Sequence, residues 1–222
     1  MPVNRIQVLN NGNILGLWQI TESSEELIPF ACLDPDEFVQ FSKFKSPLRR
    51  LHWLAWRALL RKMIPESNFS LIYDDNGKPF PHDHSFQLSV SHSGNWATCF
   101  IDANHPVGLD LEAVHERVLK VKERFLSPLE LEYFSPSAND PFVFTVLWSA
   151  KEAVFKYIGQ KGIDFRQQIT IEPFSPYESH SFFVNIHHNS LAKKLVLKWQ
   201  NIDSKYLLVH TQCQEKHSIM SC

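Results

Sequence analysis

The chain has 222 residues, of which 44% are hydrophobic and 13% aromatic, and its formal net charge is −2. This length suits one large domain or two smaller lobes, and the apolar content is sufficient to fill a core, which argues against intrinsic disorder. A net charge this close to zero does not indicate that the protein as a whole binds nucleic acid. No apolar stretch approaches the roughly 20 residues that span a bilayer.

Cysteine usage and the first residues favour a reduced cytoplasmic setting. The four cysteines lie far apart and form no C-x-x-C pair, so neither a disulfide framework nor a zinc site is expected. The mixed, polar start lacks the apolar segment of a secretory signal. We therefore expect a cytoplasmic protein that contacts neither nucleic acid nor membrane.

The first hundred residues are predicted to combine strands and helices. Pro47 follows Ser46 as a first helical proline follows its N-cap. The run Asp-Asn-Gly-Lys-Pro that ends at Pro79 is a strong turn signal. The predicted elements are a strand over 14–20, a polar turn, helical segments between about 34 and 63, a turn over 74–79, a strand over 86–92, a tight turn over 93–95 and a strand over 96–102.

A D-x-E pair follows this hairpin. Residues 107–112 read Val-Gly-Leu-Asp-Leu-Glu and alternate with the period of a strand. The apolar residues share one side, which puts Asp110 and Glu112 together on the other, with Cα atoms roughly 7 Å apart. We expect this strand to be the third of a meander. Solvated carboxylates on a half-exposed strand are the ordinary alternative to a Mg²⁺ site.

The second half is predicted to continue with helices and then strands. Ser127, Pro128 and Glu130 form a capping-box pattern. The predicted elements are a loop over 135–141, a helix over 142–158 ended by the glycines of 159–162, and strands over 168–172, 181–187, 194–199 and 206–211. The natural division lies near 104–107, which gives two α+β lobes, 1–106 and 107–222.

The helix over 142–158 carries charges on an otherwise apolar surface. Trp148, Glu152 and Lys156 follow at i, i+4 and i+8, so they share one stripe. An exposed Glu-Lys pair at this spacing contributes only about 0.2–0.5 kcal/mol. The apolar flanks indicate burial between sheets, where charges need partners or a polar cleft. Together with the D-x-E strand, the stripe could form a site for a hard cation and phosphate.

Two further segments could bind phosphate. Ser91 and His92 are adjacent in a strand and point to opposite faces, and the G-x-S-x-G elbow is missing, which argues against a serine hydrolase. The alternatives for them are phosphate binding and plain hairpin chemistry. Residues 43–62 contain seven basic residues and no acidic one. This face is either simply solvated or binds a nucleotide-like polyanion.

Five segments in this order resemble the 4′-phosphopantetheinyl transferases, specifically the Sfp type with two lobes in one chain. The segments are 77–79 (Gly-Lys-Pro), 88–94 (Leu-Ser-Val-Ser-His-Ser-Gly), 108–112 (Gly-Leu-Asp-Leu-Glu), 124–130 (Arg-Phe-Leu-Ser-Pro-Leu-Glu) and 148–156 (Trp-Ser-Ala-Lys-Glu-Ala-Val-Phe-Lys). The resemblance runs from about 43 to 162 and is weaker outside that range. It implies two α+β lobes related by a pseudo-twofold axis, with coenzyme A between them.

The resemblance also implies an activity and roles for single residues. Enzymes of this family transfer the phosphopantetheine arm of coenzyme A to a serine of a carrier protein and release adenosine 3′,5′-bisphosphate. Glu152, directly or through a water on the ion, is the expected general base, and Lys156 is expected to stabilise the developing charge. The other implied roles are Asp110, Glu112 and Glu152 as ligands of Mg²⁺ (or Mn²⁺), Lys78, Ser91, His92 and Lys156 as contacts of the coenzyme, and Lys45 and Arg57 near its 3′-phosphate.

The expected partners are coenzyme A and, transiently, an acyl or peptidyl carrier protein of fatty-acid, polyketide or nonribosomal peptide synthesis. Residues 113–134 are the expected docking region, and a monomer is expected. One rival function is a coenzyme A or nucleotide-binding module without catalysis. The presence of a candidate base argues against it, because binding alone needs no base. The other is a Mg²⁺-dependent phosphodiesterase, which would hydrolyse coenzyme A without a carrier.

Overall fold

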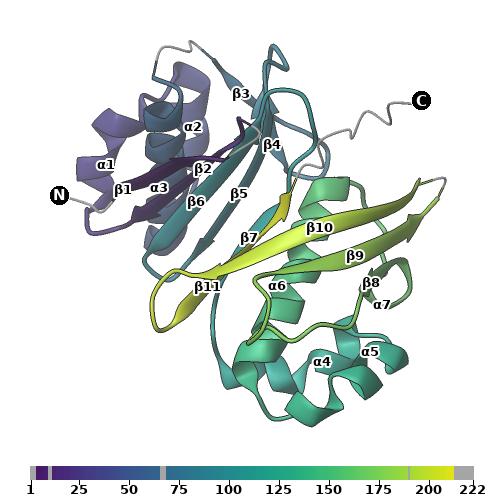
Figure 1. Cartoon of the computed structure of the whole chain (residues 1–222). Coiled ribbons are helices and arrows are strands. Elements are labelled where there is room, and N and C mark those ends of the chain that lie inside the picture. The colour runs from purple at the N-terminus through teal and green to yellow at the C-terminus, as the bar shows by residue number, and fades with distance from the viewer. Residues whose placement is uncertain (1–3, 10–11, 66–68, 190, 213–222) are drawn as a thin grey trace.

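The computed structural model describes residues 4–9, 12–65, 69–189 and 191–212. The chain folds as a mixed α+β protein with two antiparallel sheets next to each other, each packed against helices (Figure 1). The expected α+β class is confirmed. None of the helices in the described ranges combines the length and the apolarity needed to cross a bilayer.

The N-terminal unit, as we call the elements from β1 to β6, is built on a sheet of order β1-β2-β6-β5. Its strands are β1 Asn4–Val8, β2 Ile14–Gln19, β5 Gln87–Ser93 and β6 Trp96–Asp102, with β3 Leu71–Tyr73 and β4 Pro79–Pro81 as a separate pair. Its helices are α1 Ser24–Ala31, α2 Pro35–Ser42 and α3 Pro47–Met63. A cluster that includes Trp18, Leu59 and Leu88 fills the space between α3 and the sheet.

The sequence predicted most, but not all, of this unit. Helix α3 starts at Pro47 with Ser46 as its N-cap, as expected, and β6 covers the predicted residues. Helix α1 lies where only a polar turn was expected. Its capping box, in which Ser23 and Glu26 exchange hydrogen bonds, was a readable signal, although the internal Pro29 opposes a helix. Strand β1 was also missed.

The C-terminal unit, from β7 onward, has a sheet of order β7-β11-β10-β9-β8. Its strands are β7 Leu109–Ala113, β8 Ile169–Ile171, β9 Ser181–His188, β10 Leu191–Asn201 and β11 Tyr206–Gln212. Its helices are η1 Glu116–Lys120, α4 Lys122–Phe125, α5 Pro128–Tyr133, η2 Ser135–Ser137, α6 Pro141–Ile158 and α7 Phe165–Gln168. Helix α6 runs along this sheet and buries Val146, Leu147 and Val154 (Figure 1).

The strand with the D-x-E pair is not the third strand of a meander, so that expectation is wrong. β7 pairs antiparallel with β11, and Leu111 lies opposite Leu208 about a hundred residues later. β6 ends at Asp102, and the chain bends before β7 begins. Alternation along the strand predicts its faces but not its partner, because the partner is remote in sequence.

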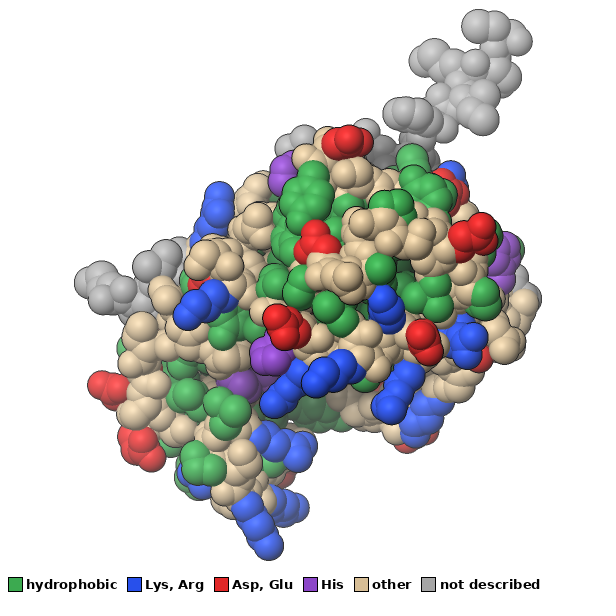
Figure 2. All heavy atoms as spheres, turned by 90° about the horizontal axis from the view of Figure 1, so that it is seen from below, with side chains coloured by type: hydrophobic (Ala, Val, Ile, Leu, Met, Phe, Trp, Pro, Cys, Tyr) green, Lys and Arg blue, Asp and Glu red, His purple; other side chains and the backbone are tan. Residues whose placement is uncertain are grey.

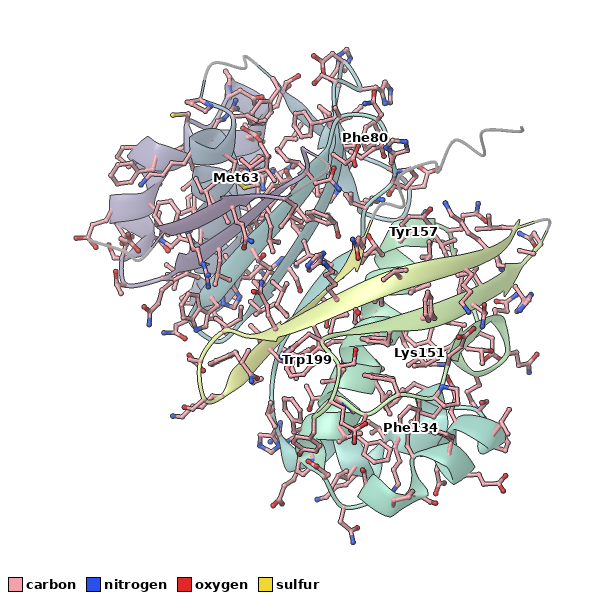
Figure 3. All side chains as sticks on the ribbon, in the orientation of Figure 1. Met63, Phe80, Phe134, Lys151, Tyr157 and Trp199 are labelled. Atoms are coloured by element: carbon pink, nitrogen blue, oxygen red, sulfur yellow. The ribbon has the colours of Figure 1, made fainter. Side chains whose placement is uncertain are left out.

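An apolar cluster joins the two units. It contains residues of both sheets, namely Leu15, Leu17, Trp96, Phe100, Val107, Leu109, Leu111 and Leu208. Next to it, the Leu109 amide donates to Ser89 Oγ at 3.0 Å, so β7 is tied to β5 through a side chain. Figure 3 shows Met63 among the helices of the N-terminal unit and Lys151 and Trp199 within the C-terminal unit. A domain boundary at 106/107 agrees with this arrangement and stays a prediction.

Candidate functional site

The candidate site lies where β5, β7 and α6 meet. Lys156 Nζ on α6 donates to Asp110 Oδ1 of β7 at 2.7 Å and to Ser91 Oγ of β5 at 3.0 Å. Ser91 Oγ in turn donates to the same Asp110 oxygen at 3.0 Å. Three segments that are distant in sequence thus converge on one carboxylate oxygen, and both units contribute to the cluster.

Gly108 permits the close contact between β7 and α6. A Cβ at this position would lie 2.0 Å from the Ala153 carbonyl oxygen and 2.8 Å from the Tyr157 amide nitrogen. Any side chain would therefore push the start of β7 away from the helix backbone. Because Asp110 follows two residues later and Lys156 lies on the facing helix, this glycine sets the distance across the site.

Negative charge exceeds positive charge at this cluster. Asp110 Oδ2 is buried and has no hydrogen-bond partner among the described residues. Partial burial, and then the nearby Asp110, raise the pKa of Glu112 to about 7, although Trp148 Nε1 donates to its Oε1 at 3.4 Å. Burial and Asp110 also raise the pKa of Glu152, against the opposing effect of Lys156. Of these three carboxylates, only Asp110 forms an ion pair among the described residues, with Lys156.

This donor set fits a hard divalent cation, although the described residues contain no cluster of three His, Cys, Asp or Glu side chains close enough to form a ready metal site. In this structure the Lys156 ammonium lies against Asp110 instead. The unpartnered Asp110 oxygen and the raised pKa values of Glu112 and Glu152 indicate a local demand for positive charge. Carboxylate oxygens are the ligands that Mg²⁺ and Mn²⁺ accept.

Two histidines stand beside the cluster. The rings of His92 on β5 and His52 on α3 are stacked, with centroids 4.3 Å apart and planes inclined by 24°. His52 Nε2 lies 2.7 Å from the Gly94 carbonyl oxygen, which only accepts, so this nitrogen carries the proton. Desolvation, and then His52 and Lys156, lower the pKa of His92 to about 4. The sequence reasoning singled out His92 but missed His52, a buried histidine within the basic segment.

The turn between β3 and β4 docks on the C-terminal end of α6. Lys78 Nζ donates to the Lys156 carbonyl oxygen at 3.0 Å, and Asn76 Nδ2 donates to the Gly159 carbonyl oxygen at 2.9 Å. From the other side, Lys161 Nζ donates to the Asp75 carbonyl oxygen at 2.8 Å. Burial lowers the pKa of Lys78. Lys78 therefore belongs to the same neighbourhood as Lys156, and its turn links the two units.

No described contact joins Arg57 or Lys45 to the cluster. Arg57 is buried in the N-terminal unit, where its Nε lies 3.0 Å from Glu37 Oε1 and its Nη2 donates to the Tyr73 hydroxyl at 2.7 Å. Its guanidinium also stacks over the Trp53 ring. Residues 43–62 contain no acidic residue, and the acidic partner of Arg57 comes from α2. Lys45 is exposed in the loop before α3. Their assignment to the 3′-phosphate stays a prediction.

The molecular surface has a basic region. In the view of Figure 2, Lys and Arg side chains gather over the lower half of the face, with histidine side chains beside them, while acidic side chains are spread more widely. The formal net charge of the chain is only −2, so the sorting of charge into regions, rather than its total, provides the attraction for an anion.

Residues 106–207 match the family model of the 4′-phosphopantetheinyl transferase superfamily. The chain is 34% identical over 128 residues to the 4′-phosphopantetheinyl transferase gsp of Aneurinibacillus migulanus, which covers 55% of this chain and 53% of that protein. It is 32% identical over 150 residues to psf-1 of Bacillus pumilus (64% and 63%) and 30% identical over 149 residues to Sfp of Bacillus subtilis strain 168 (58% and 66%). The chain thus spans between about half and two thirds of the length of these relatives.

Proposed function

We propose, because residues 106–207 match the 4′-phosphopantetheinyl transferase superfamily and the curated relatives carry that name, that the protein transfers 4′-phosphopantetheine from coenzyme A to a serine of an acyl or peptidyl carrier protein. The observation that carries the proposal is that Lys156 and Ser91 both donate to Oδ1 of the buried Asp110, with Glu112 and Glu152 near enough to be affected by its charge. Such a cluster suits chemistry on a diphosphate.

Coenzyme A brings about four negative charges at neutral pH, so its site requires a cation and several donors. We assign Asp110, Glu112 and Glu152 as the residues that hold Mg²⁺, for which Mn²⁺ can substitute. The bound ion neutralises the diphosphate and polarises its oxygens. The proposed phosphate contacts are Lys156, Ser91, His92 and Lys78, with Lys45 and Arg57 on the side of the 3′-phosphate.

The residues of the chain then have defined tasks in the transfer. The carrier serine oxygen forms a bond to the phosphorus that bears pantetheine, and the bond from this phosphorus to the bridging oxygen breaks. Adenosine 3′,5′-bisphosphate leaves with that oxygen. Glu152 accepts the serine proton. The Lys156 ammonium stabilises charge on the phosphate oxygens.

We also propose that the two units act as lobes, 1–106 and 107–222, with the coenzyme at their junction. The N-terminal unit then provides the side that holds the adenine and 3′-phosphate, and the C-terminal unit provides the carboxylates and Lys156. Because residues of both units already converge within one chain, a monomer suffices for the site. Residues 113–134 remain the proposed docking region for the carrier.

Mass spectrometry of carriers tests the proposal. The protein is incubated with coenzyme A, Mg²⁺ and unmodified carriers from fatty-acid, polyketide and peptide synthesis. We expect at least one carrier to gain the mass of one phosphopantetheine, and chelation of the ion to abolish the gain. Tight coenzyme A binding without modification of any carrier would favour a binding module. Hydrolysis of coenzyme A in the absence of a carrier would favour a phosphodiesterase.

A further inference from the structure

We propose, on the basis of the function proposed above, that His52 is a positioning residue which holds the imidazole of His92 for contact with a phosphate of coenzyme A. The two rings stack face to face, with centroids 4.3 Å apart. His52 lies on α3 and is only 6% exposed, whereas His92 lies on β5 and is exposed. One member of the pair is therefore fixed in the core, while the other is open to a ligand next to Ser91, whose hydroxyl binds the cluster.

His52 is itself held by the turn that follows His92. Its Nε2–H group donates to the Gly94 carbonyl oxygen at 2.7 Å, two residues beyond His92. This bond fixes the plane of the His52 ring, and the stack passes that orientation on to His92. A buried aliphatic residue would fill the same space in the core but would offer neither the hydrogen bond nor a flat ring to stack on.

The same turn is supported from the C-terminal unit. Gly94 has a φ of +55°, and a Cβ at this position would lie 1.9 Å from the Tyr206 hydroxyl oxygen of β11. A glycine is required here both by the left-handed backbone and by the approach of Tyr206. His52 and Tyr206 therefore enclose the segment that carries His92, one from each unit, which gives it a fixed place next to Lys156 and Asp110.

His92 is neutral in the absence of ligand. Desolvation first, and then the neighbouring His52 and Lys156, lower its pKa to about 4, whereas a bound phosphate would favour its protonation. A neutral imidazole still has one N–H group with which to bind a phosphate oxygen. The position of the ring, rather than a permanent charge, is then what His52 contributes.

Three variants of His52 separate the contribution of its ring from that of its hydrogen bond to Gly94. His52→Phe keeps a flat ring but loses the donor to Gly94, His52→Gln keeps a donor without a ring, and His52→Ala removes both. Steady-state kinetics and calorimetry with coenzyme A should give a KM and a Kd raised about tenfold in the Gln and Ala variants, with kcat within about threefold. The Phe variant keeps the stack but loses the bond that orients its ring, so its KM and Kd should lie between those of the wild type and the Ala variant. His210→Ala, at a buried histidine of β11 that packs on Phe100, is the matched control and should leave both constants unchanged.

A double-mutant cycle with His92 distinguishes positioning from a general structural role. If His52 acts through His92, then His52→Ala in a His92→Ala background should raise KM no further, whereas a structural loss would add in full. Full additivity, an unchanged coenzyme A affinity in His52→Ala, or a Phe variant as weak as the Ala variant would each overturn the inference. If His52→Ala does not fold, the Phe and Gln variants decide alone. A wild-type protein that fails to bind coenzyme A would instead contradict the proposed function.

Discussion

Helix α6 carries two lysines, five residues apart, that each meet a carboxylate in very different ways. Lys151 is fully buried, and its Nζ donates to both oxygens of Glu130 at 2.7 and 2.9 Å and to the carbonyl oxygens of Phe165 and Ile169. Glu130 also accepts from the Ile171 amide. This pair is completely satisfied by the protein, which is what a structural ion pair in a core requires.

The pair of Lys156 and Asp110 is incomplete. Lys156 is 26% exposed, and Asp110 has one buried oxygen without a partner in the described part of the chain. Burial and neighbouring charge raise the pKa of the two other carboxylates, Glu112 and Glu152. The comparison teaches that the presence of an ion pair does not identify a site. What distinguishes Asp110 is an unpartnered carboxylate oxygen next to two further carboxylates whose pKa values are raised, because a bound cation can satisfy all three.

The largest expected effect is a loss of stability when the ion pair of Lys151 and Glu130 is broken. Lys151→Met would leave Glu130 charged and unpaired in the core, which should lower the free energy of unfolding by about 3–5 kcal/mol. Urea unfolding monitored by tryptophan fluorescence measures this. A change below about 1 kcal/mol would show that the pair is not the structural element described here.

The matched substitution at the other lysine should act on catalysis instead. Lys156→Met removes a donor to the phosphates, so we expect kcat for carrier modification to fall by about 10²–10³-fold. The free energy of unfolding should change by only about 1 kcal/mol, because Lys156 is partly solvated. The same urea titration and the carrier assay are applied to both variants. If the Lys156→Met variant modified the carrier at the wild-type rate, Lys156 would have no role in catalysis.

A smaller effect on Tm is expected from the competition between Mg²⁺ and a proton for the Glu112 carboxylate. The pKa of Glu112 is raised from 4.5 to about 7, so the folded state without a cation holds this proton more tightly than the unfolded state. Its stabilising contribution is complete below 4.5 and is lost as the pH rises through 7. Mg²⁺ competes with that proton, so we expect the ion to raise Tm more at pH 8 than at pH 6.

Differential scanning fluorimetry with and without Mg²⁺ at both pH values measures this shift. Glu112→Gln cannot ionise, so it should lose most of the pH dependence and should be more stable than the wild type at pH 8 without the ion. Equal Mg²⁺ shifts at both pH values in the wild type would rule out Glu112 as the group involved.

The smallest expected effect concerns the turn that docks on α6. Asn76→Ala removes one hydrogen bond to the Gly159 carbonyl oxygen, which should lower the free energy of unfolding by about 0.5–1.5 kcal/mol and raise the KM for coenzyme A slightly. Hydrogen exchange should speed up in residues 74–78 and at the end of α6 but not around Lys151. Faster exchange around Lys151 as well would mean that the two lysine environments are coupled.

Local signals in the sequence predicted much of this architecture. The N-cap at Ser46, the capping box at Ser127 and the two-residue turn at Gly94 all lie where short-range chemistry placed them. Asp110 and Lys156 were singled out by strand and helix periodicity, and the structure brings them into contact.

Remote pairing was not predictable in the same way. The partner of β7 is β11, and the partner of Arg57 is Glu37 on another helix. His52 was missed because its role depends on the stacking of its ring on a residue of another element, and no spacing in the sequence predicts such a contact. The satisfied state of Lys151 and the unsatisfied state of Asp110 likewise became visible only once side chains from distant segments were placed.

Asp110→Asn offers the most direct test, because it keeps the shape of the side chain at the centre of the site and removes its charge. In a single-turnover assay with coenzyme A, Mg²⁺ and a carrier that the wild type modifies, we predict that the rate falls by at least about 10²-fold while Tm stays close to the wild-type value. A variant that modifies the carrier at the wild-type rate would contradict the account.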